Sequence, residues 1–317
     1  MKRLIKIVFY VFLIAFLLSP FLIRDYGLNP EEYALKLDIE NGSFLEIDGY
    51  QTFYIDFNPN SEKTILFLHG FGGSATNWLE VMPQLSDEGY RVVAVDLKGF
   101  GFSEKNKDEN YSHPSQVNFL NSFIEKLELK DITLVGHSMG ANIATMYYQE
   151  YPEKIRNLVL VSPSLMEERN EDKIRSNALK VLDFPVVREY VRIVLKCALR
   201  DGRIEDILNS AVYEPELVNL QEPFFIDPTL FLGWEYVLIR MSASSFENVL
   251  KEDISEIDIP VLMIWGEEDT WVSVSKSNSL KRRIENSELE VIENVGHLPM
   301  LENPEEFRSP LKNFLKN

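Results

Sequence analysis

The chain has 317 residues, of which 45% are hydrophobic and 26% are charged, a composition typical of globular proteins. Its formal net charge of −18 argues against a nucleic-acid-binding protein, because a phosphate backbone attracts an excess of Lys and Arg. The single cysteine, Cys197, excludes an intrachain disulfide and a cysteine-based metal site.

Residues 1–25 predict a membrane anchor. Basic residues at positions 2, 3 and 6 precede the apolar run Ile7–Ile23, which is broken by Ser19 and Pro20. As a helix, this run would be roughly 26 Å long, and the apolar residues before it extend it toward the ~30 Å hydrocarbon core. Because basic residues stay on the cytoplasmic side, we expect a single-pass protein with its N-terminus in the cytoplasm and the rest outside. A signal sequence cleaved before secretion and a buried helix of a soluble protein are the alternatives.

A strand–helix alternation begins after a polar linker at residues 26–43. The stretch Phe44–Phe57 alternates apolar and polar residues around Asp48-Gly49, which predicts a β-hairpin. Buried strands and amphipathic helices then follow in turn. The predicted strands lie at 63–70, 91–99, 131–138, 155–163, 259–266 and 289–296, and the predicted helices at 76–90, 115–129, 139–152, 274–284 and 304–316.

The alternation is interrupted by residues 164–256, which have helical patterns and no clear strand. Strands that alternate with helices form a mainly parallel sheet covered on both faces, here from residues 44–163 and 257–317. The helical insertion leaves from the carboxyl end of a strand, the edge at which open α/β sheets bind ligands. We therefore predict an α/β core with a helical cap, at 164–256, over the ligand site.

The pentapeptide Gly136-His137-Ser138-Met139-Gly140 lies between a predicted strand and a predicted helix. A sharp strand-to-helix turn crowds the backbone, so the positions two before and two after the central serine must lack bulk. Such a turn exposes the Ser138 hydroxyl at the sheet edge as a candidate nucleophile. The five-residue pattern alone also fits a plain tight turn.

A serine nucleophile requires a base, and the chain has four histidines. His297 follows the last predicted strand, at the same sheet edge as Ser138, and is the candidate base. We expect His69 to brace its own loop by hydrogen bonds, His137 to pack inside the sharp turn at Gly136–Gly140, which we call the elbow, and His113 to lie at the surface.

Backbone N–H groups are needed to stabilise the oxyanion of an acyl-transfer reaction. The stretch His69–Gly73 follows a strand, and its glycines allow a sharp turn with inward-facing amides. The candidate donors are the N–H groups of Phe71 and of Met139, the residue after the serine. No phosphate-loop motif, dinucleotide fingerprint or metal-ligand spacing occurs, so no cofactor or metal is expected.

Five motifs in this order resemble those of the α/β-hydrolase superfamily, over about Phe44–Asn317. They are the His69–Gly73 stretch, DLKGFGFSE (Asp96–Glu104), the elbow Gly136–Gly140, WGEEDTWV (265–272) and NVGHLPMLENPEEF (294–307). Monoacylglycerol lipases, carboxylesterases and carbon–carbon bond hydrolases share this layout. Lys98 departs from the usual Arg or Pro before the glycine, in a loop that supports the fold more than the chemistry.

The resemblance implies an α/β-hydrolase fold with a mainly parallel, eight-stranded sheet and a helical cap inserted after strand 6. It selects Asp269 as the acid that orients His297, in preference to the neighbouring Glu267 and Glu268. By resemblance the reaction is hydrolysis of a carboxylic ester through an acyl-enzyme on Ser138. The serine excludes haloalkane dehalogenases and epoxide hydrolases, which carry aspartate at this position.

Aromatic residues in the predicted cap, together with the membrane signal, favour an apolar ester such as a monoacylglycerol as the substrate. These aromatic residues, which equally suit packing of the cap onto the core, are Phe184, Phe224, Phe225, Phe231 and Trp234. A carbon–carbon bond hydrolase or a cofactor-free perhydrolase with the same triad is the first alternative, and a non-catalytic ligand-binding protein is the second. Acyl chain length, the alcohol moiety, the physiological role and the oligomeric state do not follow from the sequence.

Overall fold

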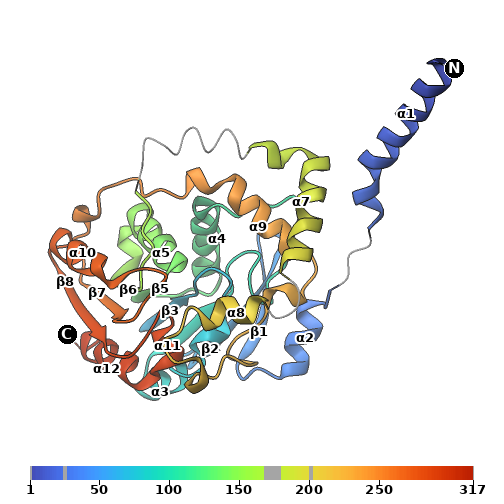
Figure 1. Ribbon diagram of the computed structural model, residues 1–317. Coiled ribbons are helices and arrows are strands. Elements are labelled where there is room, and N and C mark those ends of the chain that lie inside the picture. Colours follow the sequence, from blue (N-terminus) through green and yellow to red (C-terminus); the bar gives the residue numbers. More distant parts are fainter. Residues whose placement is uncertain (1, 24–26, 168–179, 200–202, 317) are drawn as a thin grey trace.

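An eight-stranded, mostly parallel β-sheet forms the centre of the molecule, with helices on both faces (Figure 1). The computed structural model describes residues 2–23, 27–167, 180–199 and 203–316. The strand order in the sheet is β1-β2-β4-β3-β5-β6-β7-β8. The predicted α/β class with an eight-stranded sheet is confirmed.

The strands and helices alternate along the chain as the sequence predicts. The strands are β1 (Gly42–Ile47), β2 (Tyr50–Phe57), β3 (Thr64–Leu68), β4 (Arg91–Val95), β5 (Ile132–His137), β6 (Ile155–Val161), β7 (Val261–Gly266) and β8 (Ser287–Ile292). The helices are α1 (Lys2–Leu18), α2 (Pro30–Leu37), α3 (Met82–Asp87), α4 (His113–Lys126), α5 (Met139–Glu150), α7 (Pro185–Ala198), α8 (Arg203–Asn209), α9 (Trp234–Ala243), α10 (Ser277–Arg283), α11 (Pro299–Glu302) and α12 (Pro304–Phe314). Strand β2 is antiparallel to both of its neighbours, β1 and β4, and all other neighbouring strands are parallel.

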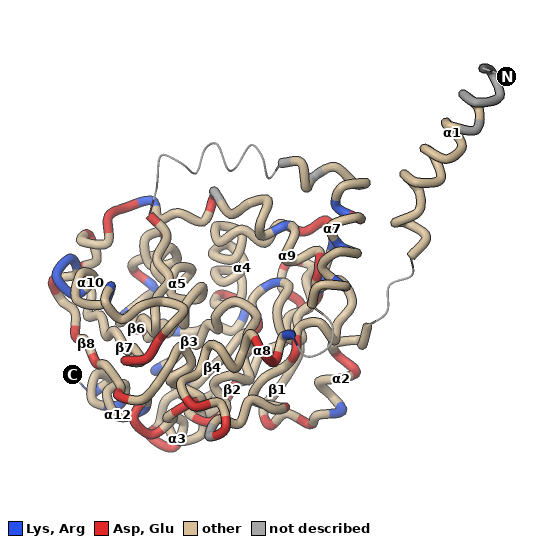
Figure 2. Tube along the Cα trace, viewed as in Figure 1, with Lys and Arg blue, Asp and Glu red and all other residues tan. Residues whose placement is uncertain are grey.

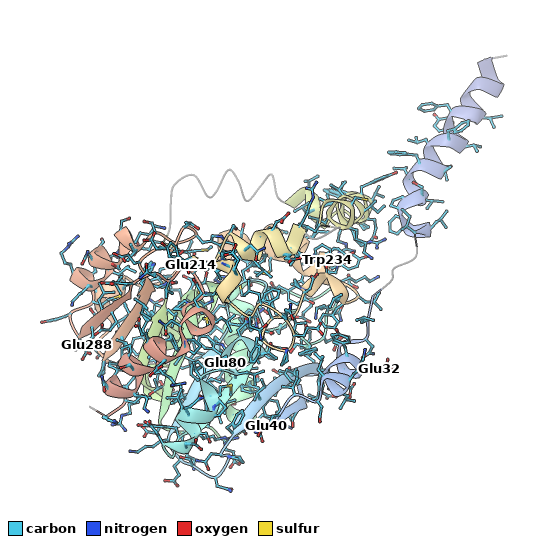
Figure 3. The ribbon with its side chains drawn as sticks, turned by 60° about the horizontal axis from the view of Figure 1, so that its bottom comes forward. Glu32, Glu40, Glu80, Glu214, Trp234 and Glu288 are labelled. Atoms are coloured by element: carbon cyan, nitrogen blue, oxygen red, sulfur yellow. The ribbon has the colours of Figure 1, made fainter. Side chains whose placement is uncertain are left out.

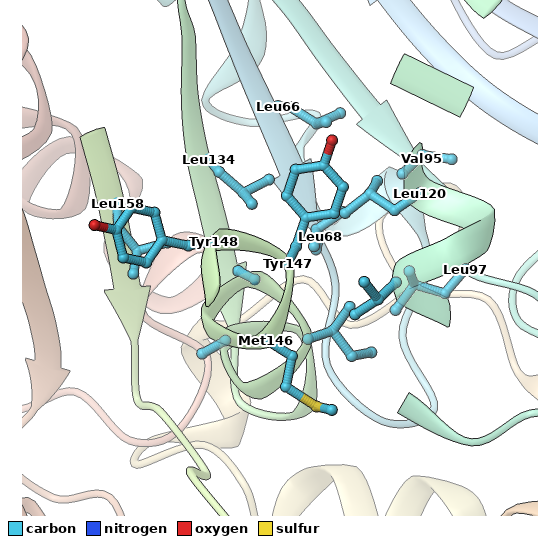
Figure 4. Packing of buried hydrophobic residues seen from close by; sticks show 14 of the residues in the cluster. Leu66, Leu68, Val95, Leu97, Leu120, Leu134, Met146, Tyr147, Tyr148 and Leu158 are labelled. Carbon is cyan, nitrogen blue, oxygen red and sulfur yellow. The ribbon is translucent and has the colours of Figure 1, made fainter. Parts of the chain in front are cut away.

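Alternate side chains of the strands fill two apolar cores, one on each face of the sheet. Leu66, Leu68 and Leu134 belong to the core under α4 and α5, where they lie near Tyr147 (Figure 4). The intervening strand residues, such as Phe67, belong to the core under α3 and α12. Every residue of β3, β5 and β7 is buried, as expected for parallel strands covered on both faces. The sheet is therefore a rigid frame, and its carboxyl edge holds the loops of the candidate site in place.

The hairpin of β1 and β2 has the predicted two-residue turn. Ile47 pairs with Tyr50, which leaves Asp48 and Gly49 as the loop. Both loop residues have positive φ, at 51° and 80°, which is typical of the type I′ turns that match the twist of paired strands.

The chain between β6 and β7 contains α7, α8 and α9, which together with their connecting segments we call the cap (Figure 1). Residues 168–179 and 200–202 of the predicted cap lie outside the described chain. Trp234, the first residue of α9, lies within the cap (Figure 3). Helix α7 packs against α9 and carries residues of both charge signs (Figure 2).

The face of α7 that packs against α9 is charged. Glu189 accepts hydrogen bonds from Arg192 Nε at 2.8 Å and from the Tyr236 hydroxyl at 2.8 Å. Lys196 forms an ion pair with Glu235 at 3.0 Å, and the Glu235 side chain is fully buried. The cap is thus joined internally by ionic contacts, in contrast to the apolar cores beside the sheet.

Helix α1 extends away from the rest of the molecule (Figure 1). Its described side chains are exposed and apolar, as at Phe12, which is 71% exposed. No helix in the described part of the chain combines the length and the apolar character that are needed to cross a bilayer. The membrane anchor expected at residues 1–25 therefore stays a prediction. Within residues 26–43, expected as a linker, the structure contains the helix α2, which begins after the N-cap residue Asn29.

Candidate active site

The predicted nucleophile lies on the sharp turn between β5 and α5. Ser138 has a φ of 51° and a ψ of −110°, a strained conformation for a residue with a side chain. Its N–H donates to the Val161 carbonyl at 2.9 Å, and its own carbonyl accepts the N–H of Ser164 at 3.2 Å. The chain at the end of β6 therefore holds the strained turn, and the serine remains partly exposed.

The elbow glycines permit a close approach of backbone segments. A Cβ atom at Gly136 would lie 2.4 Å from the carbonyl oxygen of Gly140. A Cβ atom at Gly140 would lie 2.5 Å from the carbonyl oxygen of His69, in the next loop. Because both distances are shorter than van der Waals contact, a side chain at either position would push α5 away from the sheet.

The structure pairs the predicted base with the predicted acid. His297 Nδ1 lies 2.8 Å from Asp269 Oδ2, and both side chains are buried. The second oxygen, Asp269 Oδ1, accepts two backbone N–H groups of its own loop, at 2.8 and 2.9 Å. These bonds fix the carboxylate, and the carboxylate in turn orients the imidazole ring. The competing residues Glu267 and Glu268 are exposed.

The backbone of His297 is also held from two sides. Its N–H donates to the carbonyl of Ala211 at 2.6 Å, and its carbonyl accepts a hydrogen bond from His137 Nε2 at 2.8 Å. Burial, and then the nearby His297, hold the pKa of His137 well below its usual value, so the His137 ring is neutral near pH 7. The elbow histidine, expected only to pack, is thus a hydrogen-bond donor to the loop of the candidate base.

His69 braces the loop that carries Phe71, as the sequence predicts. His69 Nε2 accepts the N–H of Leu97 at 3.0 Å, and Nδ1 donates to the Gly70 carbonyl at 2.7 Å. Burial lowers the pKa of His69 to about 4, so the neutral ring keeps one donor and one acceptor nitrogen at pH 7. Phe71 lines the cavity that contains Ser138, and Met139 directly follows Ser138 as the first residue of α5, so the oxyanion-binding role of their N–H groups stays a prediction.

Ser138, His297 and Phe71 line one cavity of about 250 Å³. Asp269 does not line this cavity and instead contacts His297. Within the described chain, no hydrogen bond joins Ser138 Oγ to the His297 ring. Nor do the described residues include a group of three or more His, Cys, Asp or Glu arranged to bind a metal. The structure therefore gathers the serine, the histidine and the Phe71 loop around one space, with the acid next to the histidine.

A second cavity, of about 140 Å³, adjoins the first and is lined almost entirely by apolar side chains. The two cavities share Phe71, Leu208, Phe225 and Trp271. Further lining residues come from the cap, among them Ile204, Ile207, Trp234, Val237 and Leu238. Of the cap aromatics singled out in the sequence, Phe225 and Trp234 line this cavity, Phe231 is buried beside Phe102, and Phe184 is exposed on the outside.

Glu302 is a further candidate for a functional role that was not predicted from the sequence. Its Oε2 accepts the N–H groups of Gly296 and Tyr213, each at 2.8 Å, and its Oε1 accepts the N–H of Leu298 at 2.9 Å. Burial raises the pKa of Glu302, while the three N–H groups act in the opposite direction. In the sequence, only its place within NVGHLPMLENPEEF marks it.

His113, which was expected at the surface, is buried, and that prediction is wrong. The ring atom Nδ1 of His113 accepts a hydrogen bond from Asn142 Nδ2 at 2.7 Å, and the backbone N–H of His113 donates to Asn248 Oδ1 at 2.7 Å. Burial lowers the pKa of His113 to about 4. The network joins three segments, namely α4, α5 and the end of the cap. Only the tertiary structure reveals that these segments lie close together.

The chain is similar in sequence to known α/β hydrolases. A family model described as the alpha/beta hydrolase fold matches residues 63–186. The uncharacterized hydrolase YugF of Bacillus subtilis (strain 168) is 28% identical over 274 residues, which are 85% of this chain and 96% of that protein. Monoacylglycerol lipase ABHD6 of Rattus norvegicus is 25% identical over 259 residues, which are 81% of this chain and 76% of that protein.

A solved structure has the same fold. The crystal structure of a membrane phospholipase A, described as a novel bacterial virulence factor, matches this chain with a TM-score of 0.63 and 25% identity. The match covers 100% of this chain and 98% of that chain. With the strained serine elbow, the paired acid and histidine, and the mostly parallel eight-stranded sheet, these likenesses show that the chain has the α/β-hydrolase fold and is similar to esterases and lipases with that fold.

Proposed function

We propose that the chain is a serine hydrolase that cleaves carboxylic esters through an acyl-enzyme. The observation that carries this proposal is the 2.8 Å contact between His297 Nδ1 and Asp269 Oδ2, with the same histidine lining a cavity shared with Ser138. A neutral imidazole whose Nδ1–H is engaged by a carboxylate has its Nε2 free to accept a proton. The strained elbow supports the role of the serine, because it presents the hydroxyl to that cavity.

In the proposed reaction, Ser138 Oγ attacks the ester carbonyl while His297 Nε2 takes its proton. The resulting oxyanion is stabilised by the N–H groups of Phe71 and Met139. His297 then returns the proton to the leaving alcohol, and a water molecule attacks the acyl-enzyme by the same route. Asp269 stabilises the positive charge on the imidazole during each transfer.

We propose an ester with an apolar acyl group, such as a monoacylglycerol, as the substrate. The apolar cavity supports this choice, since it adjoins the Ser138 cavity through the shared residues Phe71, Leu208, Phe225 and Trp271. An acyl chain that leaves the serine past these side chains would be transferred from water to apolar surroundings, which is favourable by about 0.8 kcal/mol for each buried CH₂ group. The name of the relative ABHD6, a monoacylglycerol lipase, points the same way.

The test is a panel of p-nitrophenyl esters and monoacylglycerols of increasing acyl length, assayed with the wild-type chain and with Ser138→Ala. We expect kcat/KM to rise with acyl length until the apolar cavity is filled, and Ser138→Ala to lower kcat by several powers of ten. Ester cleavage by Ser138→Ala at the wild-type rate would refute the proposed nucleophile. A flat response to acyl length would refute the apolar acyl site while leaving the nucleophile in place.

We further propose that α1 attaches the protein to a bilayer, with the N-terminus in the cytoplasm and the catalytic domain on the other side. Two features support attachment. The described side chains of α1 are apolar and exposed. Apolar side chains are also exposed at Phe184 (65%), the N-cap residue of the neighbouring helix α7, and at Val194 (63%), within α7. The two helices touch where the rings of Phe16 and Tyr190 stack at 5.0 Å.

Attachment can be tested by replacing two exposed apolar residues of α1, Phe12 and Ile14, with Asp in the full chain. We expect the wild-type protein to stay in the membrane fraction after carbonate extraction and the variant to be released, because charged groups resist transfer into hydrocarbon. The intact mass of the wild-type protein decides between an anchor and a signal sequence, since cleavage near residue 19 would remove the segment. Release of the uncleaved wild-type protein by carbonate would contradict the anchor.

A further inference from the structure

Glu302 binds the backbone on both sides of the candidate base. It is the last residue of α11, and its carboxylate accepts the N–H groups of Gly296 at 2.8 Å and Leu298 at 2.9 Å. These two residues flank His297 directly, so the carboxylate holds both ends of the short segment that carries the imidazole. Hydrogen bonds to an ionised acceptor are shorter and stronger than those between neutral groups.

The same carboxylate also binds the cap. Glu302 Oε2, which accepts the N–H of Gly296, also accepts the N–H of Tyr213 at 2.8 Å. Tyr213 belongs to the segment 210–213, which follows α8 and which we call the cap strap. One oxygen atom therefore joins the cap strap to residues 296–298, which carry the candidate base and which we call the base loop. If the two segments separated, at least one N–H group would lose its acceptor.

The cap strap contacts the loops of both the acid and the base through further bonds. Thr270 Oγ1, next to the acid, donates to the Ser210 carbonyl at 3.1 Å, and the N–H of His297 donates to the Ala211 carbonyl at 2.6 Å. The approach is close enough that a Cβ atom on Gly296 would lie 2.6 Å from the Ala211 oxygen. The strap thus lies directly on the backbone of the base loop.

We propose that Glu302 is a positioning residue that fixes His297 for proton transfer and couples its position to the cap strap. The inference rests on the proposed function, because it takes His297 as the base. Glu302 does not line the cavity that contains Ser138, so it acts through backbone N–H groups and not on the substrate. Leu208 lines both cavities and lies two residues before the cap strap. The cap strap is bonded to Glu302, and Glu302 is bonded to the residues beside His297, so this carboxylate connects the substrate pocket to the base.

The test compares Glu302→Gln with the matched control Glu305→Gln in the full-length chain, using p-nitrophenyl butyrate as the probe. Gln has nearly the same shape but only one acceptor oxygen, so at least one of the three N–H groups loses its partner. We expect Glu302→Gln to lower kcat about 10- to 100-fold with KM nearly unchanged, since small misplacements of a catalytic group have effects of that order. Glu305 is exposed and carries the same charge, and its variant should keep the wild-type kcat.

A second readout separates positioning from general stability. We expect hydrogen–deuterium exchange in Glu302→Gln to rise in the peptides covering 210–216 and 294–301, and to stay at the wild-type level in β5. Glu302→Asp, which keeps the charge and both oxygens on a shorter side chain, should recover part of the lost kcat, and it serves as the test variant if Glu302→Gln does not fold. A wild-type kcat in Glu302→Gln, or a lower kcat without faster exchange at 210–216, would overturn the proposal.

The two hypotheses fail in different ways. If the wild-type chain and Ser138→Ala cleave the ester equally well, the proposed nucleophile is wrong, while the exchange data still show whether Glu302 joins the strap to the base loop. If Ser138→Ala is inactive and Glu302→Gln equals the wild type in kcat and exchange, only the positioning role is wrong.

Discussion

The sheet and the cap of this molecule share two apolar cores, but the cap adds buried charged residues to its apolar contacts. Strands β3, β5 and β7 are buried at every position and pack through apolar side chains. In the cap, by contrast, the buried residues include charged ones, namely Arg188, Glu189, Arg192 and Glu235. Apolar burial is non-directional and rigid when well packed, whereas ion pairs and hydrogen bonds depend on exact partners and are lost one at a time.

The cap is also joined to the core by directional bonds that reach the candidate site. Asn77 Nδ2, in the loop after Phe71, donates to the Phe224 carbonyl at 2.8 Å, and His297 N–H donates to the Ala211 carbonyl at 2.6 Å. The loops of the candidate site therefore start from the sheet and are also bonded to the cap.

The largest expected effect concerns the pairing of acid and base. Asp269→Asn leaves the two N–H bonds to Oδ1 possible but presents the wrong partner to His297 Nδ1. We expect kcat for ester cleavage to fall about 10⁴-fold with little change in the melting temperature, because the histidine is held in the wrong tautomer. The variant Glu268→Gln, one residue earlier and exposed, is the control. Equal losses in both variants would mean that general loop charge, and not the pairing, matters.

The next effect compares the two regions directly. Leu134→Ala, in β5, should lower the free energy of unfolding by about 2–5 kcal/mol, because it leaves a cavity in a packed core. Glu235→Ala removes a fully buried carboxylate and its ion pair with Lys196, and we expect the resulting loss of stability to be confined to the cap. Urea unfolding and hydrogen–deuterium exchange measure both, and the exposed Glu247→Ala is the cap control. Faster exchange throughout the sheet in Glu235→Ala would contradict the separation of the two regions.

Acid should weaken the contact between α4, α5 and the cap. Burial lowers the pKa of His113 from 6.5 to about 4, so the unfolded chain binds its proton first as the pH falls. The stability contributed by the neutral ring is therefore complete above pH 6.5 and is lost between pH 6.5 and 4, by about 3 kcal/mol. His113→Asn keeps an acceptor for Asn142 without titrating, so its urea midpoint should depend less on pH over this range. Parallel pH curves for the two proteins would refute this.

The smallest expected effect concerns the close contact between the cap strap and the base loop. Gly296→Ala would place a Cβ atom 2.6 Å from the Ala211 oxygen, and we expect a loss of about 1–3 kcal/mol in stability together with lower kcat. Gly49→Ala is the matched control, because its φ of +80° is strained but no atom lies within 4 Å of the new Cβ. That variant should lose stability and keep its kcat. Full activity in Gly296→Ala would show that the strap does not affect the base.

The sequence was most informative where one local pattern determines one local structure. The turn Asp48-Gly49, the elbow around Ser138 and the βα alternation follow from the spacing of apolar residues and glycines. The role of Glu302 could not be predicted, because it depends on the directions of three backbone N–H groups from two distant segments. His113 was misplaced for a similar reason, since its burial depends on Asn248, which is 135 residues away in the chain.

The most direct test of the central claim is to treat the full-length protein with a fluorophosphonate and identify the modified residue by peptide mass mapping. We expect a single adduct on Ser138, formed much more slowly in His297→Ala and Asp269→Asn. An adduct on another serine, or complete loss of ester hydrolysis while Ser138 remains unmodified, would contradict the assignment of Ser138 as the nucleophile.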